Sequence, residues 1–192
     1  RLHKIPANIN FNCSSLAEPV ACCVHAVIEQ VDVKAGDRVL VTGPGPIGLI
    51  TSQVIKAQGA NVYLVGRPED GDRLRIGEEL GIDQIIIDGR EDISATISRL
   101  TNNDGVDIAF ECSGSEGGVQ TCFRSLRKLG KYVQVGVSAR DSLVNMNIIG
   151  SREVSANGAF GSTFTSWDRS LRLISEGKIK IKPLITAELP LS

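Results

Sequence analysis

The feature that most constrains the fold is a glycine pattern where a β-branched run meets a helical one. In VLVTGPGPIGLITSQVIKAQG, Gly43, Gly45 and Gly48 form G-x-G-x-x-G between the strand-like run 38–42 and the helical pattern 46–58. The first glycine permits a tight turn, the second lets the backbone approach a pyrophosphate, and the third lets helix and strand pack closely. Anions bind at the start of such a helix because its amides and dipole attract negative charge.

Three glycines could also form an ordinary strand–helix turn. Here the strand, the helix and a second strand about 20 residues later all agree with a dinucleotide-binding loop, which is therefore our prediction. A P-loop is excluded because no G-K-[ST] follows the glycines.

The remaining sequence repeats this alternation of strand and helix. The expected helices cover 46–58, 72–80, 91–100, 116–129 and 164–176, and several of them end at a glycine, namely Gly59, Gly81, Gly130 and Gly177. The expected strands are 38–42, 62–65, 84–87, 106–111, 131–135 and 153–157. They are almost continuously apolar, as strands are when helices cover both faces of a sheet. We predict an α/β fold, a doubly wound (Rossmann) six-stranded parallel sheet with helices on both faces.

The two ends of the sequence suggest a domain taken from a longer chain. We expect residues 1–36 to be a leading segment with a helix over 14–30, and residues 37–192 to be the dinucleotide-binding domain. The sequence begins at Arg1 and ends on the strand-like run 184–192 with no element after it, so we expect truncation at both ends.

Composition argues against several classes of protein. The 21 basic and 22 acidic residues nearly cancel, so no strong field attracts nucleic acid or a membrane surface. Without an apolar run of about 18 residues or a signal peptide, we expect a cytoplasmic protein. The five cysteines form no CxxC pair and are expected to be free, mostly buried thiols. His25 has no partner at metal-ligand spacing, so we expect a packed histidine and no metal site in this chain.

Open α/β sheets bind ligands at the carboxyl ends of their strands. An acidic residue usually ends the second strand and binds the ribose hydroxyls of NAD, but Gly66 is in that place here, followed by Arg67 and Arg73. This change favours NADP over NAD; alternatively, Arg67 stacks on the adenine ring, or both arginines belong to a solvated loop. The expected cofactor-binding residues are Gly43, Gly45, Pro46, Ile47, Gly48, Gly66, Arg67, Arg73, Ser113, Gly136, Val137, Ala159 and Phe160. For those that follow strands four to six, turn chemistry alone is the alternative.

Five segments, taken in order, resemble the zinc-type medium-chain alcohol dehydrogenases, especially the sorbitol and polyol branch. They are LAEPVACCVHAV, VKAGDRVLVTGPGPIGL, DIAFECSG, LGKYVQVGV and GKIKIKPLIT, and the resemblance covers nearly all 192 residues. It implies a six-stranded cofactor domain, with Ser113, Gly136 and Ala159 near the nicotinamide half, and a mostly upstream catalytic domain whose zinc ligands are not in this sequence. Glu18 matches a glutamate beside the catalytic zinc of that branch; by itself it is a carboxylate at a helix start. The branch carries an arginine where this chain has Gly161.

The resemblance implies the cofactor domain of a zinc-dependent dehydrogenase that transfers a hydride between NAD(P) and an alcohol or polyol. It also implies a homo-oligomer formed through the edge strand near Val154. We expect zinc only in the intact enzyme, and no activity from this chain alone. Two alternatives remain: a zinc-free reductase of the quinone-reductase type, and a non-catalytic module that senses dinucleotide.

Overall fold

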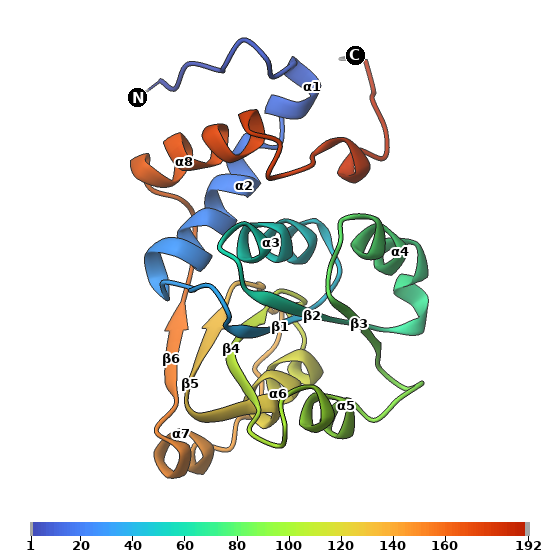
Figure 1. Cartoon of the computed structure of the whole chain (residues 1–192), viewed down its shortest axis with the longest axis vertical. Coiled ribbons are helices and arrows are strands. Elements are labelled where there is room, and N and C mark those ends of the chain that lie inside the picture. Colours follow the sequence, from blue (N-terminus) through green and yellow to red (C-terminus); the bar gives the residue numbers. More distant parts are fainter. Residues whose placement is uncertain (1, 191–192) are drawn as a thin grey trace.

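The computed structural model of the chain describes residues 2–190 and contains one parallel sheet between two layers of helices (Figure 1). The strand order is β3-β2-β1-β4-β5-β6, and every neighbouring pair is parallel. This order reverses direction between β1 and β4, which confirms the doubly wound fold. The strands are β1 (Arg38–Thr42), β2 (Asn61–Gly66), β3 (Gln84–Ile87), β4 (Val106–Glu111), β5 (Leu126–Gln134) and β6 (Ser155–Gly158).

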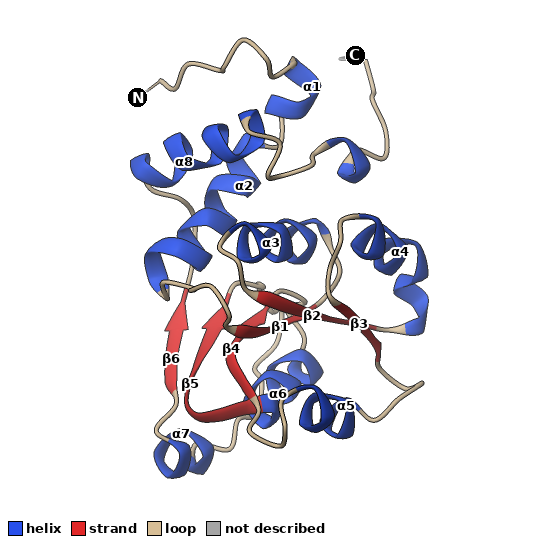
Figure 2. Ribbon diagram, in the orientation of Figure 1, coloured by secondary structure: helices blue, strands red, loops and turns tan. Residues whose placement is uncertain are grey.

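Helices cover both faces of the sheet, as Figure 2 shows. On one side lie α2 (Ala17–Val24), α3 (Pro46–Ala57), α4 (Gly71–Glu79) and α8 (Phe164–Ser175), and on the other lie α5 (Ile93–Leu100), α6 (Glu116–Ser125) and α7 (Asn147–Arg152). Shorter elements are α1 (Phe11–Ser14), the π-helix η1 (His25–Gln30) and the 3-10 turns η2 (Pro68–Asp70) and η3 (Lys182–Leu184). Among the described residues, no helix is long and apolar enough to cross a bilayer.

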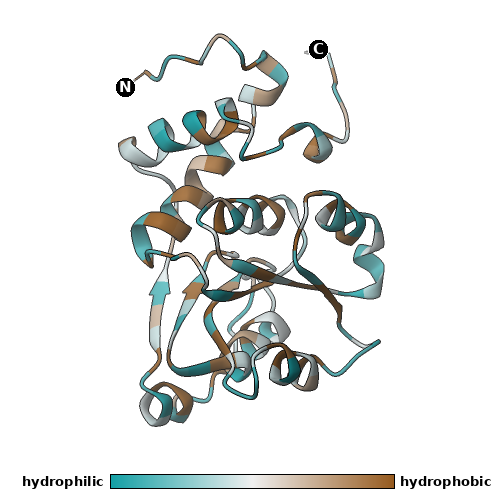
Figure 3. Cartoon of the chain, viewed as in Figure 1, coloured by the Kyte–Doolittle hydropathy of each residue, from teal (hydrophilic) through white to brown (hydrophobic). Residues whose placement is uncertain are grey.

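Successive residues of the central strand point into two different cores. Val39 and Val41 of β1 belong to the core beneath α3, whereas Leu40 between them belongs to the core beneath α6. All three are fully buried. Because both faces of the sheet are covered, these three consecutive residues are all apolar, and brown stretches of ribbon mark such apolar runs in the central strands in Figure 3.

The expected helix 116–129 is wrong at its C-terminal end. Helix α6 ends at Ser125, and residues 126–130 begin strand β5. Leu126 is buried in the core beneath α6, and the Arg127 Nε donates to Asp107 Oδ1 at 2.6 Å. These contacts with the neighbouring strand outweigh the local helical pattern. Gly130 therefore lies within a strand, whereas Gly59, Gly81 and Gly177 have the positive φ of helix-ending residues.

The expected helix over 14–30 is interrupted. Helix α1 ends at Ser14, α2 begins at Ala17, and residues 25–30 form a π-helix. Pro19 has no N–H to donate to the residue four positions earlier, so a continuous helix would lose that hydrogen bond. Two further differences are α7, which the sequence did not predict, and residues 185–190, which form no strand; residues 191 and 192 lie outside the described part.

Candidate functional site

The glycine loop at the carboxyl end of β1 is held by two very close contacts. Gly43 has φ +91°, and its N–H donates to Val65 O at 2.9 Å. A Cβ on Gly43 would lie 2.8 Å from the Cα of Ser113, in the turn after β4. A Cβ on Gly48 would overlap the carbonyl oxygen of Gly43. Both positions therefore require glycine, the first for its φ and the second for the packing of α3 against the turn.

Gly45 differs, because no packing requirement explains it. It is the N-cap residue of α3 with φ −68° and ψ 177°, angles that any residue adopts, and a Cβ there would meet nothing within 4 Å. Pro46 follows at the first helical position, where its missing N–H costs no hydrogen bond. The open space beside Gly45 faces the start of α3, whose first amides have no partner within the helix. This is suitable geometry for a bound phosphate.

A cleft of about 460 Å³ joins this loop to the ends of β2 and β4. Six of the residues predicted from the sequence line it: Gly43, Gly45, Gly66, Arg67, Arg73 and Ser113. Pro46, Ile47 and Gly48 continue from the same loop into α3. The structure thus gathers most of the predicted residues from three strand ends that are far apart in sequence.

At the end of β2, an acidic residue that the sequence analysis missed lies between the two arginines. Asp70 is only 15% exposed and accepts a hydrogen bond from the Arg67 backbone N–H at 3.0 Å. Its carboxylate lies 3.5 Å from Nη1 of Arg73 and 4.0 Å from Nε of Arg67. Both guanidinium groups remain largely exposed, and all three residues line the cleft. Asp70 therefore orders this loop through the Arg67 N–H and lies between the two cations, while Nε of Arg67 is also 3.9 Å from Glu69.

None of the four residues predicted after β5 and β6 lines this cleft; they lie at the carboxyl ends of the next two strands of the sheet. Gly136 packs against Gly114 so closely that a Cβ on Gly136 would lie 2.5 Å from the Gly114 N. Val137 is 77% exposed, and Phe160 is 89% exposed at the end of β6. Ala159 is held there by a 2.9 Å hydrogen bond from its N–H to Gln134 O. These four residues continue the row of strand ends beyond Ser113.

A second residue that the sequence analysis missed is Glu111, the last residue of β4. It is fully buried, and its carboxylate accepts hydrogen bonds from the Ser113 and Gly114 N–H groups at 2.8 and 3.0 Å. Its position after the apolar run VDIAF was visible in the sequence, but two further partners, the Gln134 amide of β5 and the Thr42 hydroxyl of β1, come from other strands. Only the fold brings them together.

The described residues do not form a zinc site. No group of three or more His, Cys, Asp or Glu side chains within residues 2–190 is arranged to hold a metal ion. Glu18 is exposed in the first turn of α2, where its Oε1 lies 3.1 Å from Sγ of Cys22. All five cysteines are free, as predicted. Burial, together with the hydrogen bond to Glu18, raises the pKa of Cys22 to about 11, and burial raises that of Cys23 to about 12.

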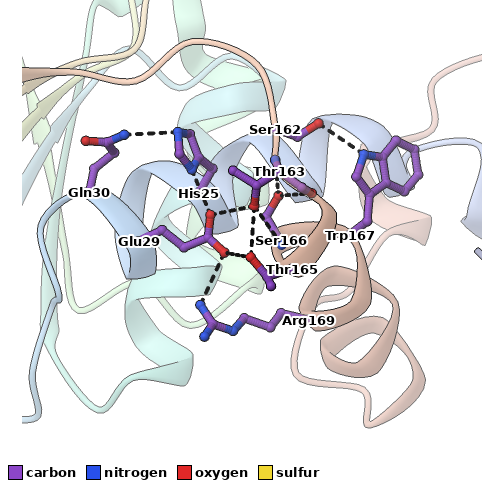
Figure 4. A network of polar contacts seen from close by, with 9 residues as sticks. All are labelled: His25, Glu29, Gln30, Ser162, Thr163, Thr165, Ser166, Trp167 and Arg169. Carbon is purple, nitrogen blue, oxygen red and sulfur yellow. Dashed lines mark hydrogen bonds and ion pairs between the residues drawn. The ribbon is translucent and has the colours of Figure 1, made fainter. Parts of the chain in front are cut away.

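His25 is a packed, hydrogen-bonded histidine, as predicted. Its Nδ1 lies 2.8 Å from Glu29 and its Nε2 lies 3.0 Å from Gln30 (Figure 4). Glu29 also accepts hydrogen bonds from the Thr163 and Thr165 hydroxyls at 2.7 and 2.6 Å. Burial alone would raise the pKa of Glu29, but these bonds and the one to His25 lower it. The network fastens η1 to the start of α8.

Comparison with known proteins agrees with this architecture. Residues 46–176 match the zinc-binding dehydrogenase family. The chain is 38% identical over its full length to sorbitol dehydrogenase of Halalkalibacterium halodurans and 31% identical to D-arabitol-phosphate dehydrogenase of Enterococcus avium. A solved structure of a putative zinc-binding dehydrogenase from Sinorhizobium meliloti bound to NADP superposes with TM-score 0.86 at 29% identity, covering 96% of this chain and 54% of that one.

The chain spans about half the length of these curated relatives, 56% of the sorbitol dehydrogenase and 54% of the arabitol-phosphate enzyme. The matched residues run from the start of α3 to just after the end of α8. They include most of the parallel sheet and its helices. The order of the strands and the glycine loop agree with it. The chain belongs to the zinc-binding dehydrogenase family.

Proposed function

We propose that this chain binds a nicotinamide dinucleotide in the cleft between the glycine loop and the ends of β2 and β4. The observation that carries the proposal is the contrast within the loop, where Gly43 and Gly48 are required by packing while Gly45 leaves open space at the start of α3. The pyrophosphate would lie beside Gly45, the adenosine half toward Arg67, and the nicotinamide half toward Gly136. Bound nicotinamide supplies the hydride chemistry, and the chain supplies binding and orientation.

Within this function we propose a preference for NADP(H). The last residue of β2 is Gly66 and not a carboxylate, and Arg67 and Arg73 line the cleft beside it, together with Asp70 and Asp88. Asp70 attracts the same two cations, but at 3.5 and 4.0 Å these contacts are long for ion pairs. Because both arginines are mostly exposed, one charge-assisted contact with the phosphate is worth the low end of 1.5–3 kcal/mol, roughly a tenfold preference. The NADP-bound relative supports this assignment.

The test is a titration with NADPH and NADH, followed by nicotinamide fluorescence, in wild type, Arg67→Ala and Arg75→Ala. Arg75→Ala is the matched control, because it removes the same charge from an exposed position of α4, where the Arg75 side chain pairs with Asp72. We expect tighter binding of NADPH, a preference that Arg67→Ala reduces and Arg75→Ala leaves unchanged. Equal affinities in wild type would refute the preference. No binding of either dinucleotide to folded chain would refute the proposed function.

We further propose that the whole protein is an NAD(P)-dependent alcohol or polyol dehydrogenase whose zinc ligands lie outside residues 2–190. The full-length identity to sorbitol and arabitol-phosphate dehydrogenases supports this substrate class. This chain alone should then produce no reduced coenzyme from sorbitol and NAD(P)⁺, with or without added Zn²⁺. Turnover above background by the purified chain would contradict the assignment of the zinc ligands.

A further inference from the structure

The buried carboxylate of Glu111 is surrounded by hydrogen-bond donors. Its Oε1 accepts from the Ser113 N–H and from the Ser113 hydroxyl, and its Oε2 accepts from the Gly114 N–H at 3.0 Å and from the Gln134 side-chain amide at 2.9 Å. Within residues 2–190, no lysine, arginine or histidine forms an ion pair with it. A buried carboxylate of this kind depends on its hydrogen bonds alone for compensation.

The closest donors belong to two different loops at the carboxyl edge of the sheet, and the Thr42 hydroxyl at the end of β1 adds a longer contact of 3.4 Å to Oε1. Ser113 and Gly114 form the turn after β4, and Gln134 ends β5. The main-chain oxygen of Glu111 accepts from two more amides of the second loop, Val135 at 2.9 Å and Gly136 at 2.8 Å. One residue therefore ties together the turn after β4 and the turn after β5.

The loops have no room to settle differently around this carboxylate. A Cβ on Gly136 would lie 2.6 Å from Glu111 Oε2, and one on Gly118 would lie 2.6 Å from Oε1. A Cβ on Gly114 would overlap the oxygen of Val137 and lie 3.0 Å from its carbonyl carbon. Three glycines thus surround the Glu111 side chain and the loops that it joins. Gly118 and Gly136 are required by the carboxylate oxygens, and Gly114 is required by the contact between the two turns.

We propose that Glu111 is a positioning residue for the nicotinamide half of the dinucleotide, acting through the turns at Ser113–Gly114 and Gly136–Val137. The assignment rests on the proposed function. Each of the two oxygens faces a backbone N–H, which can only donate, so a carboxylate satisfies both, whereas a glutamine amide would set its own NH₂ against one of them. Arg67 and Arg73, at the adenosine end, make no contact with Glu111. Loss of the carboxylate should therefore weaken one half of the ligand selectively.

The experiment compares Glu111→Gln with Glu78→Gln, which removes the same charge from an exposed position of α4. Each protein is titrated with NADPH and with the adenosine half alone, AMP carrying a 2′-phosphate. We expect Glu111→Gln to weaken NADPH binding about tenfold, the loss of roughly one hydrogen bond to a charged group, and to leave the adenosine half within about twofold. Glu78→Gln should match wild type for both ligands. Hydrogen exchange of residues 112–118 should speed up in Glu111→Gln only.

The outcomes separate this assignment from the proposed function. A wild-type chain that binds neither ligand overturns both. Suppose that the wild-type chain binds NADPH but Glu111→Gln keeps its affinity for both ligands, or loses affinity for both equally. That result overturns the positioning role and leaves the proposed function standing. If Glu111→Gln does not fold, Gln134→Ala replaces it, since it removes the amide that links β5 to the carboxylate while leaving the carboxylate in place. The substitution also removes the bonds of this side chain to the Tyr132 hydroxyl and to the Gly136 oxygen. The same selective loss, smaller in size, is expected there, and its absence overturns the assignment.

Discussion

The two later glycines of the loop should respond in opposite ways to the same added methyl group. In Gly48→Ala, the new Cβ would overlap the Gly43 oxygen and lie 3.0 Å from its carbonyl carbon. The obstacle is backbone that packs against Ser113 in turn, so it cannot yield as a flexible side chain does. Overpacking of this kind costs about 1–3 kcal/mol, and we expect the upper end. For a domain of this size, that cost lowers the Tm by roughly 6–12 °C.

In Gly45→Ala, the methyl group would meet nothing within 4 Å and the backbone angles suit alanine. The free energy of unfolding should change by less than about 1 kcal/mol, because two small effects oppose each other: the unfolded chain loses conformational freedom, and alanine is a poorer N-cap residue than glycine. The methyl group would, however, occupy the space where we place the pyrophosphate, so NADPH affinity should fall at least about tenfold. Circular dichroism melts and fluorescence titrations measure both quantities. A Gly48→Ala variant as stable as wild type, or a Gly45→Ala variant that melts early, would refute this assignment of roles.

Three further predictions concern stability and reactivity away from the loop. Glu29→Gln should lower the free energy of unfolding by about 1–3 kcal/mol at pH 7. Because hydrogen bonds lower the pKa of Glu29 in the folded chain, urea melts should show the full difference above the pKa of the unfolded chain and a shrinking difference as pH falls through the pKa of the folded chain. A difference that does not depend on pH would contradict this prediction. Leu129→Gly should raise the Tm slightly, because Leu129 has φ +58° and is 61% exposed. The substitution relieves about 1–2 kcal/mol of backbone strain and loses little packing. A lower Tm would show that the packing of the Leu129 side chain contributes more than the strain costs. Cys22 and Cys23 should be alkylated slowly by iodoacetamide at pH 8 in the folded chain, as their raised pKa values keep them protonated, and rapid labelling of either, followed by mass spectrometry, would exclude this.

The sequence predicted best what local pattern and general rules determine. Strands 38–42, 84–87 and 106–111 lie where the sequence predicts them. Each is an apolar run between glycines, and such a run is buried well in a sheet that helices cover on both faces. Residues 126–130 read as helix, because the decisive contact, Arg127 with Asp107, joins residues 20 positions apart. Glu111 escaped notice for a similar reason, because two of its partners, Gln134 and Thr42, lie 23 and 69 positions away. Asp70 differs, because its contacts with Arg67 and Arg73 are each three positions away. That spacing was present in the sequence, but the burial of the carboxylate between the two arginines was not.

The contact between Gly43 and the backbone of Ser113 also limits how such domains can be recombined. Gly43 belongs to the first βαβ half of the sheet and Ser113 to the second, and a Cβ on the glycine would lie 2.8 Å from Ser113 Cα. A chimera that takes residues before β4 from one relative and the remainder from another must therefore match the turn after β4 to the glycine loop of its new neighbour. Exchange of the two halves between relatives therefore requires that both turns follow the same backbone path in the two parent proteins.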